Sequence, residues 1–245
     1  MASFRSPNCL LSALTPEALR RISPHLTRVP LQREQWLSRA GEPVQVAHFP
    51  EGGVISCVAL DRATRTEVGL IGVEGVTVAG AVLGDDISAF DTFVQVDGAT
   101  ALTIPLKELR DAMEEHASMR QTLGCYLACF LLQVSYGLVA SAQHLMDARL
   151  ARWLLMCHDR VAGDEIAITH EFLGLMIAAQ RSGVTVTLHA LEGAGMIRST
   201  RGRVIIRARA KLEEIAGDSY GIPEARYREL IAPFGKSSAQ PANPS

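Results

Sequence analysis

Arginine side chains are concentrated in one short part of this 245-residue chain. Between Ala178 and Lys211 there are seven cations and a single carboxylate, that of Glu192, although the whole chain carries a net charge of −2. The cations are Arg181, Arg198, Arg201, Arg203, Arg207, Arg209 and Lys211. Such groups bind the phosphates of nucleic acids, so a basic cluster in a nearly neutral chain indicates a surface that contacts DNA. A solvated arginine face on a module that contacts proteins is the alternative.

Two short helices are expected to hold these cations. Thr169 can cap the first, which we predict from about Thr169 to Ile177, because apolar residues recur there at helical spacing. They are Phe172, Leu173, Met176 and Ile177. The small residues Ala178-Ala179 suit a tight turn, and a second helix is predicted from about Arg181 to Ala194. Residues 183–187 alternate like a strand, but tertiary context often overrides local propensity, and the flanking pattern favours a helix.

A β-hairpin is expected directly after the second helix. Gly193 and Gly195 end that helix, and residues 197–206 form two strands around Arg201-Gly202. Two helices followed by a hairpin make a winged helix-turn-helix, whose second helix enters the major groove of DNA. Val184, Leu188 and Leu191 then face the core, whereas Gln180, Arg181, Ser182, Thr185 and His189 face outward.

The first half of the chain has a different pattern. Residues 10–26 predict a helical lead-in that starts at Thr15-Pro16-Glu17. From Thr27 to Pro105, short β-rich runs are separated by Gly, Pro and Asp turns, among them Asp97-Gly98. The runs are residues 44–49, 53–60, 66–71, 90–96 and 99–104. Many short strands at near-regular spacing predict a sandwich or jelly-roll barrel.

A long helix is expected after this β domain. One set of its apolar and small residues recurs in steps of four and three, which is typical of a coiled-coil seam and predicts a homodimer interface. This set is Leu123, Leu127, Phe130, Val134, Gly137 and Ser141. A second stripe, Leu131, Leu138 and Leu145, is expected to face the β domain. A core helix of a monomer is the alternative. A further helix over residues 147–160 opens the C-terminal domain.

Several classes of protein are not expected. The start of the chain lacks the apolar core of a signal sequence, and the longest apolar run, residues 123–139, is interrupted by Gln133, so we expect a soluble cytoplasmic protein with no membrane partner. Cys125 and Cys129 share one helix face, where small apolar packing is favoured over a redox role. The cysteine and histidine spacings do not indicate a metal site, and no cofactor is expected. Catalytic motifs are lacking, so we expect no enzyme. Residues 233–245 are expected to be disordered.

A jelly roll, a long dimerising helix and a winged helix-turn-helix, in that order, resemble the Crp/Fnr superfamily of bacterial transcription regulators. The most specific segments are RLARWLLMCHDR, ITHEFLGLMIAAQRSGVTVTLHALEGAGMI and RGRVIIR. The resemblance implies an α+β chain with a cyclic-nucleotide-binding-like jelly roll at 10–105, a dimerisation helix region at 106–146 and a DNA-binding domain at 147–220. It also implies a homodimer that binds two-fold symmetric DNA and contacts RNA polymerase.

The resemblance also assigns expected DNA contacts. Arg181 falls where members place an arginine that reads a guanine, Ser182 where many carry an acid, and Val186 where some carry a second arginine. These departures imply a different target sequence. Arg201 and Arg203 in the wing are expected to contact phosphates. The complete set of expected contacts is Thr169, Gln180, Arg181, Ser182, Thr185, Val186, His189, Arg201 and Arg203.

The sensory half departs further from the family. Members that bind cyclic nucleotides carry Gly-Glu and, some residues later, an arginine that neutralises the phosphate. Here Ile87 stands near the arginine position, and Asp85-Asp86 adds negative charge, which disfavours a buried phosphate. Cyclic AMP binding is therefore not expected, Glu74-Gly75 is interpreted as a structural turn, and the effector is left open. One of the isolated histidines could ligate haem, but each is more readily explained as structural. They are His25, His48, His116 and His144.

Overall fold

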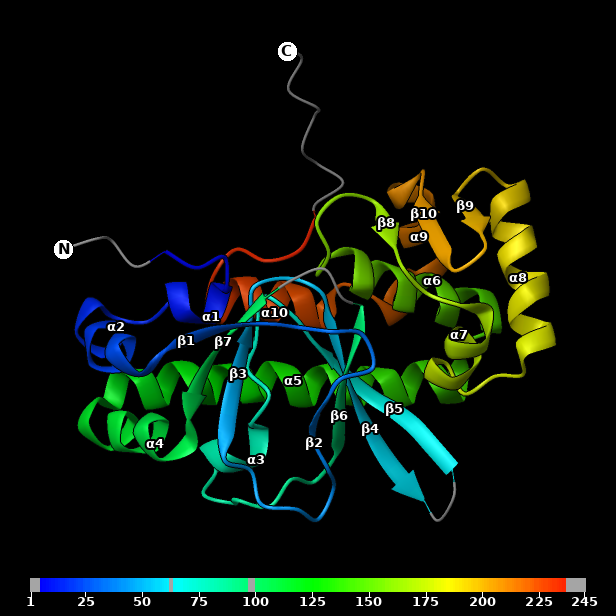
Figure 1. The fold of residues 1–245 in the computed structure, drawn as a ribbon. Helices are drawn as coiled ribbons and strands as arrows, with labels where there is room; N and C mark the ends of the chain where they lie inside the picture. Colours follow the sequence, from blue (N-terminus) through cyan, green and yellow to red (C-terminus); the bar gives the residue numbers. More distant parts are fainter. Residues whose placement is uncertain (1–4, 62–63, 97–99, 237–245) are drawn as a thin grey trace.

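The structure is a computed structural model that describes residues 5–61, 64–96 and 100–236. A β domain comes first, one long helix, α5, runs along the whole molecule, and a mainly helical domain follows (Figure 1). This order of elements confirms the predicted fold class.

The N-terminal lead-in is helical, as predicted. It consists of α1 (Cys9–Ser12), α2 (Pro16–Ile22) and the short 3-10 helix η1 (Ser23–His25). The hydroxyl of Thr15 accepts a hydrogen bond from the backbone N–H of Ala18, and Pro16 occupies the first helical position. This is the capping arrangement that the sequence indicated.

The β domain is built from two antiparallel sheets. Its strands are β1 (Thr27–Pro30), β2 (Trp36–Ser38), β3 (Val46–Pro50), β4 (Val54–Asp61), β5 (Thr64–Ile71), β6 (Asp91–Val96) and β7 (Thr100–Pro105), with the helical turn α3 (Ala79–Val82) between β5 and β6. The sheet orders are β1-β7-β3 and β2-β6-β4-β5. Phe49, Ile55, Val94 and Ile104 are fully buried between them. The five predicted strands are present, whereas β1 and β2 were not predicted. The expected Asp97-Gly98 turn lies outside the described residues.

The larger sheet is covered on both faces. Ile55 and Cys57 of β4 point into the core of the β domain, whereas Val54 and Val58 pack against residues of the C-terminal domain. Successive residues of a strand point to opposite faces, so residues 54–58 of β4 are buried on both faces and, apart from Ser56, are apolar.

Helices α4 (Leu106–Glu115) and α5 (Ala117–Gln143) follow the β domain. By length and composition alone α5 could span a membrane. In this fold it is a core helix: Tyr126 is buried against the β domain, and the Gln133 side-chain amide exchanges hydrogen bonds with the backbone N–H and C=O of Leu70 at 2.7 and 3.2 Å.

The two stripes of α5 pack differently from what the sequence predicted. Leu123 and Phe130, expected in a dimer seam, are buried in the chain's own core, and Leu127 and Val134 pack against that core. The stripe expected to face the β domain is instead exposed, by 67% at Leu131, 72% at Leu138 and 79% at Leu145. Gly69 on β5 provides the physical reason, since a Cβ at that position would lie 2.9 Å from the Phe130 ring. Of the expected seam, Gly137 is half-buried and Ser141 is exposed.

The C-terminal domain contains the predicted winged helix-turn-helix. Its elements are α6 (Met146–His158), β8 (Glu165–Ile166), α7 (His170–Met176), α8 (Arg181–Gly193), β9 (Ile197–Thr200), β10 (Arg203–Ile206) and α9 (Arg209–Ala216). The three strands form one antiparallel sheet, in the order β8-β10-β9. The strand-like run at 183–187 is helical, as predicted.

The chain then returns to the β domain through η2 (Gly217–Ser219) and α10 (Ile222–Leu230), which packs along α5. Phe234 is buried, with its ring centroid 5.2 Å from that of Tyr227. The backbone N–H of Lys236 donates to the Asp159 carboxylate at 2.8 Å. The prediction of a disordered tail from residue 233 is therefore wrong for residues 233–236, and residues 237–245 lie outside the described part.

Candidate nucleic-acid interface

The turn between α7 and α8 sets their relative position. The backbone N–H of Ala179 donates to the carbonyl of Gly174 at 2.8 Å, and Ala178 adopts a left-handed conformation with φ of 48°. A Cβ on Gly174 would lie 2.8 Å from the Ala179 carbonyl oxygen, which is closer than real Cβ contacts. Ala178 and Ala179 form the turn as predicted, but the residue that permits the close approach is Gly174, which the sequence analysis did not single out.

Helix α8 presents one face to the core and the other to solvent. Val184, Leu188 and Leu191 are buried, as predicted. The opposite face is open: the Arg181 side chain is 72% exposed and Val186 is 70% exposed. Gln180, Ser182 and His189 are also exposed. Figure 1 shows α8 at the outer edge of the molecule, where a DNA duplex can reach it.

A histidine that the sequence analysis missed connects the parts of this surface. His170 Nδ1 lies 3.2 Å from the Thr185 hydroxyl, and its Nε2 lies 3.2 Å from the Ser199 hydroxyl. The Thr185 hydroxyl donates in turn to the Arg181 carbonyl at 3.0 Å. Burial, then the nearby His189 and Arg181, lower the pKa of His170. A neutral ring fits these contacts, with Nδ1 donating to Thr185 and Nε2 accepting from Ser199.

Two of the expected contact residues also have structural roles within the motif. Thr185 is half-buried and its hydroxyl is engaged, so it positions α8 at Arg181. Thr169 is the cap of α7, because its hydroxyl accepts from the Phe172 backbone N–H at 3.3 Å. Both residues are half-buried and help to hold the two helices in place.

The wing, formed by β9 and β10, contributes further arginines to the exposed cationic surface. Arg201 is exposed at the turn between β9 and β10, and Arg203 lies 3.1 Å from the Glu165 carboxylate. Arg198 and Arg207 are also exposed. The single carboxylate of the cluster, Glu192, accepts a hydrogen bond from the backbone N–H of Ser199 at 3.0 Å.

One arginine of the basic cluster belongs to the interior. Arg209 forms ion pairs with Asp159 and Glu213 at 2.9 and 2.8 Å, and it donates to the Tyr220 hydroxyl at 2.5 Å. Its guanidinium joins α9 to the segment after α6, so Arg209 does not contribute to the exposed cationic surface.

In the described part of the β domain, a small cavity of about 30 Å³ lies beside the stretch that resembles the nucleotide-binding segment of the family. Asp85, Ile87 and Phe130 are among its lining residues. Small-molecule sites generally enclose about 300–1,000 Å³. Asp85 accepts from the Ile87 backbone N–H at 2.9 Å, and Asp86 pairs with Arg110. Burial lowers the pKa of His48, elsewhere in this domain, to about 4.

Glu74-Gly75 forms a turn, as interpreted, closed by a hydrogen bond from the Gly75 N–H to the Gly72 carbonyl at 3.0 Å. The Glu74 carboxylate also accepts from the Arg160 guanidinium at 2.7 and 3.0 Å. Arg160 follows α6, so this ion pair joins the two domains. The sequence pattern gave no sign of it, because the partners lie 86 residues apart.

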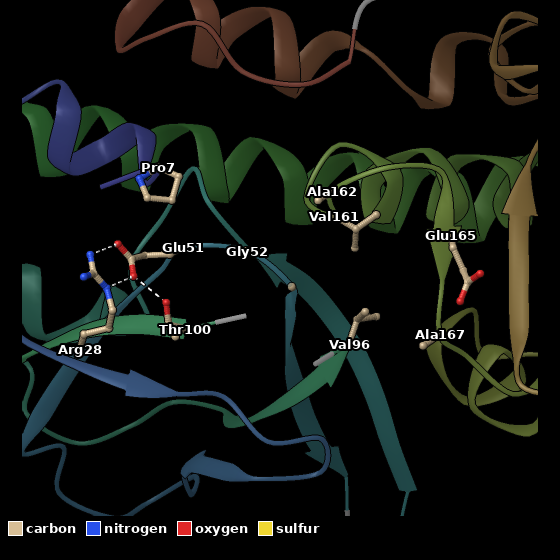
Figure 2. Close-up of a pocket in the computed structure, with 11 residues that line it drawn as sticks. Pro7, Arg28, Glu51, Gly52, Val96, Thr100, Val161, Ala162, Glu165 and Ala167 are labelled. Carbon is tan, nitrogen blue, oxygen red and sulfur yellow. Dashed lines mark hydrogen bonds and ion pairs between the residues drawn. The ribbon is translucent and has the colours of Figure 1, made fainter. Parts of the chain in front are cut away.

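A wider cleft of about 750 Å³ lies between the β domain and the segment around β8 (Figure 2). Glu51 dominates one wall and accepts from Arg28 at 2.6 and 2.9 Å and from Thr100 at 2.6 Å. These hydrogen bonds, chiefly the one from Arg28, lower the pKa of Glu51 to about 2. The carboxylate is already satisfied within the protein, so its charge is not directed toward a ligand.

The cysteines take part in packing. All five are free, and Cys57, Cys129 and Cys157 are buried. Burial raises the pKa of Cys129 to about 11, so it is a thiol at neutral pH. A thiol in this state is a weak nucleophile, which fits the expected packing role.

Comparisons with known proteins agree with this geometry. Residues 148–215 match the Crp-like helix-turn-helix domain. No curated protein sequence matches the chain significantly. Among similar solved structures is TTHB099, a CRP-family transcriptional regulator from Thermus thermophilus, with 20% identity and a TM-score of 0.64 over 78% of this chain and 97% of that one.

Two further structures are similar along nearly their entire length. FixK2 from Bradyrhizobium japonicum has 15% identity and a TM-score of 0.67 over 78% of this chain and 98% of its own. The c-di-GMP responsive global regulator CLP from Xanthomonas campestris has 14% identity and a TM-score of 0.62 over 79% and 99%. This chain therefore contains a Crp-like helix-turn-helix domain and has the overall fold of the Crp/Fnr transcription regulators.

Proposed function

We propose that the protein is a sequence-specific DNA-binding transcription regulator that acts in the cytoplasm as a homodimer on two-fold symmetric DNA. The observation that carries this proposal is the exposed face of α8, which begins at Arg181 and is flanked by the wing at Arg201. A recognition helix places its first residues against base edges, and a guanidinium matches guanine O6 and N7 together. Gln180, Ser182, Val186 and His189 lie beside Arg181 on this face.

The exposed stripe of α5 supports the homodimer. Leu131 and Leu138 of α5 lie seven residues apart and alternate with three small residues, Ala128, Ser135 and Ala142, while Leu145 continues the spacing just beyond the end of α5 at Gln143. All six are exposed and follow steps of three and four. This spacing is typical of a coiled-coil seam, and the small residues would let two helices approach closely. A stripe of exposed leucines on a long helix is otherwise unfavourable in water.

A homodimer contains two copies of α8, one from each subunit. Two recognition helices related by a two-fold axis contact half-sites about 34 Å apart, one turn of the duplex. Crp/Fnr regulators bind DNA and act as dimers, and contact with RNA polymerase is proposed here from the resemblance alone. The small cavity beside Asp85 supports a regulator that does not respond to cyclic AMP.

A selection of binding sites from randomised duplex DNA, with the full-length protein, tests this function. We expect enrichment of a two-fold symmetric motif, and an affinity that falls steeply between two salt concentrations. A ligand-binding module whose winged helix contacts other proteins would enrich no motif. That result would overturn the proposal.

A further inference from the structure

A second cavity, of about 400 Å³, lies where the β domain, α5 and the DNA-binding domain meet. Residues of β5 and α5 line one side, and residues of α6 and α7 line the other. Much of the lining is apolar and includes Val134, Trp153 and Met176. A cavity of this size, apolar with a few polar groups, has the character of a small-molecule site.

Two arginines line this cavity without an acidic partner. Arg152 is only 9% exposed and donates to the backbone carbonyls of Ser219 and Gln133 at 2.9 and 3.1 Å. Arg149 donates to the backbone carbonyl of Ile177. Within the described part of the chain, no carboxylate lies within ion-pair distance of either guanidinium. Burial is unfavourable for a cation and lowers the pKa of Arg152, although the carboxyl groups of Glu224 and Glu67, beyond ion-pair distance, act in the opposite direction.

The one carboxyl group in the lining, that of Glu67, forms no ion pair with these cations and offsets their charge only in part. Glu67 accepts hydrogen bonds from the Trp153 indole N–H at 2.7 Å and from the Ser56 hydroxyl at 2.6 Å. Burial nevertheless raises its pKa to about 7, so it is partly protonated at neutral pH. The cavity therefore carries a net positive charge within apolar walls.

We propose that this cavity binds a small apolar monoanion, a carboxylate on an aliphatic or aromatic body. The carboxylate supplies the counter-ion that Arg149 and Arg152 lack, and the body packs against Trp153 and Met176. Because the two sides of the cavity belong to different domains, the bound anion stabilises the docking of α7 on β5. Any consequence for DNA binding rests on the proposed function, whereas binding of the anion does not.

Calorimetric titration of the full-length protein, without DNA, tests the site. The probes are octanoate and 2-naphthoate, and the matched controls are octanamide, which is neutral, and octylammonium, which is a cation. We expect at least one carboxylate to bind once per chain, at least tenfold more tightly than either control. Failure of both carboxylates to bind at millimolar concentration, or equal binding of octanoate and octylammonium, would overturn the proposal.

Substitutions locate the binding site. Arg149→Gln should weaken the carboxylate at least tenfold, whereas Arg20→Gln, the same change on an exposed part of α2, should leave it within twofold. Ser141→Phe should also weaken binding by adding a ring at the cavity, whereas Gln143→Phe, two residues later and outside the lining, should not. If both Arg149→Gln and Ser141→Phe left the affinity for the carboxylate unchanged, the ligand would bind elsewhere and the proposal would be wrong.

A DNA titration with and without the carboxylate separates the two proposals. If the anion binds in calorimetry but no duplex binds under any condition, the cavity assignment stands and the proposed function fails. If the protein binds the duplex but neither carboxylate, the proposed DNA-binding function is supported and the proposed anion site is wrong.

Discussion

The Arg160 guanidinium lies 2.7 Å from the carboxylate of Glu74, and both side chains are almost completely buried. Arg160 belongs to the DNA-binding domain and Glu74 to the β domain, so the contact fixes one domain on the other. Gly72 provides the space, because a Cβ at this position would lie 2.6 Å from the Arg160 side chain. In the stretch that resembles the cyclic-nucleotide-binding segment of the family, the Glu74 carboxylate is thus paired with an arginine of the same chain.

Removal of one partner of this pair should strongly destabilise the protein. We expect Glu74→Gln to lower the free energy of unfolding by about 3–5 kcal/mol, because the buried guanidinium of Arg160 loses its counter-charge. Adding Arg160→Met should restore part of this loss, since no unpaired charge then remains. Urea denaturation of the single and double variants measures the coupling. Glu17→Gln, at an exposed ion pair, is the control and should have no measurable effect. Additive losses in the double variant would contradict this account.

Arg181 and Arg201 should affect DNA binding in different ways. Arg181→Ala should cost about 1–3 kcal/mol at one base-pair position and relax specificity there. Arg201→Ala should weaken binding to all sequences alike and reduce the salt slope by about 1, because it removes one phosphate contact. Titration against a set of single-base variants of the selected site measures both effects. A uniform loss in Arg181→Ala would show that this residue does not read a base.

The exposed leucine stripe should be necessary for the dimer. Leu138→Glu places a charge in the middle of the seam, and we expect the protein to sediment as a monomer. Leu83→Glu is the matched control, because Leu83 is 79% exposed but lies on the β domain. It should leave the sedimentation coefficient unchanged. A Leu138→Glu protein that remained dimeric would move the interface away from α5.

Gly174 should be required for the helix-turn-helix geometry. Gly174→Ala brings a methyl group against the Ala179 carbonyl, and such overpacking costs typically about 1–3 kcal/mol. Gly193→Ala, near the end of α8, meets no atom within 4 Å and should stabilise the helix instead. Thermal unfolding of the two variants should therefore shift in opposite directions. A Gly174→Ala protein of unchanged stability would mean that the turn can relax.

The helix-turn-helix could be predicted closely from the sequence because its information is local. The Thr169 cap, the inward spacing of Val184 and Leu188 and the wing glycine Gly202 all act within a few residues of one another. The strands β1 and β2 were missed because they are short and show no alternation: β1 is mostly exposed, and all three residues of β2 are half-buried.

The stripes of α5 could not be assigned in this way. Both contain apolar residues at heptad spacing, so the choice depends on what lies opposite. Gly69, distant in sequence, gives the Phe130 ring its space and decides the orientation. The Glu74–Arg160 pair and the two-sided burial of β4 arise for the same reason, from one domain docking on another. No local pattern encodes that docking.

Glu67 should make stability depend on pH in a direction opposite to that of a paired carboxylate. Its pKa is raised from 4.5 to about 7 in the folded protein, chiefly by burial. The folded state therefore retains a proton that the unfolded chain loses, and stability falls as pH rises from about 4.5 to 7. Glu67→Gln cannot titrate, yet its amide oxygen can still accept from Trp153.

The stability of the Glu67→Gln variant, relative to that of the wild type, should therefore increase as pH rises. We expect the difference in free energy of unfolding, variant minus wild type, to increase between about pH 5 and 7 by at most about 3 kcal/mol and to be constant above pH 8. Other titrating groups are common to both proteins and cancel in this difference. Urea denaturation at unit steps of pH provides the values. A difference that stays flat, or falls, over this range would show that Glu67 has no raised pKa and that the cavity already contains a compensating negative charge.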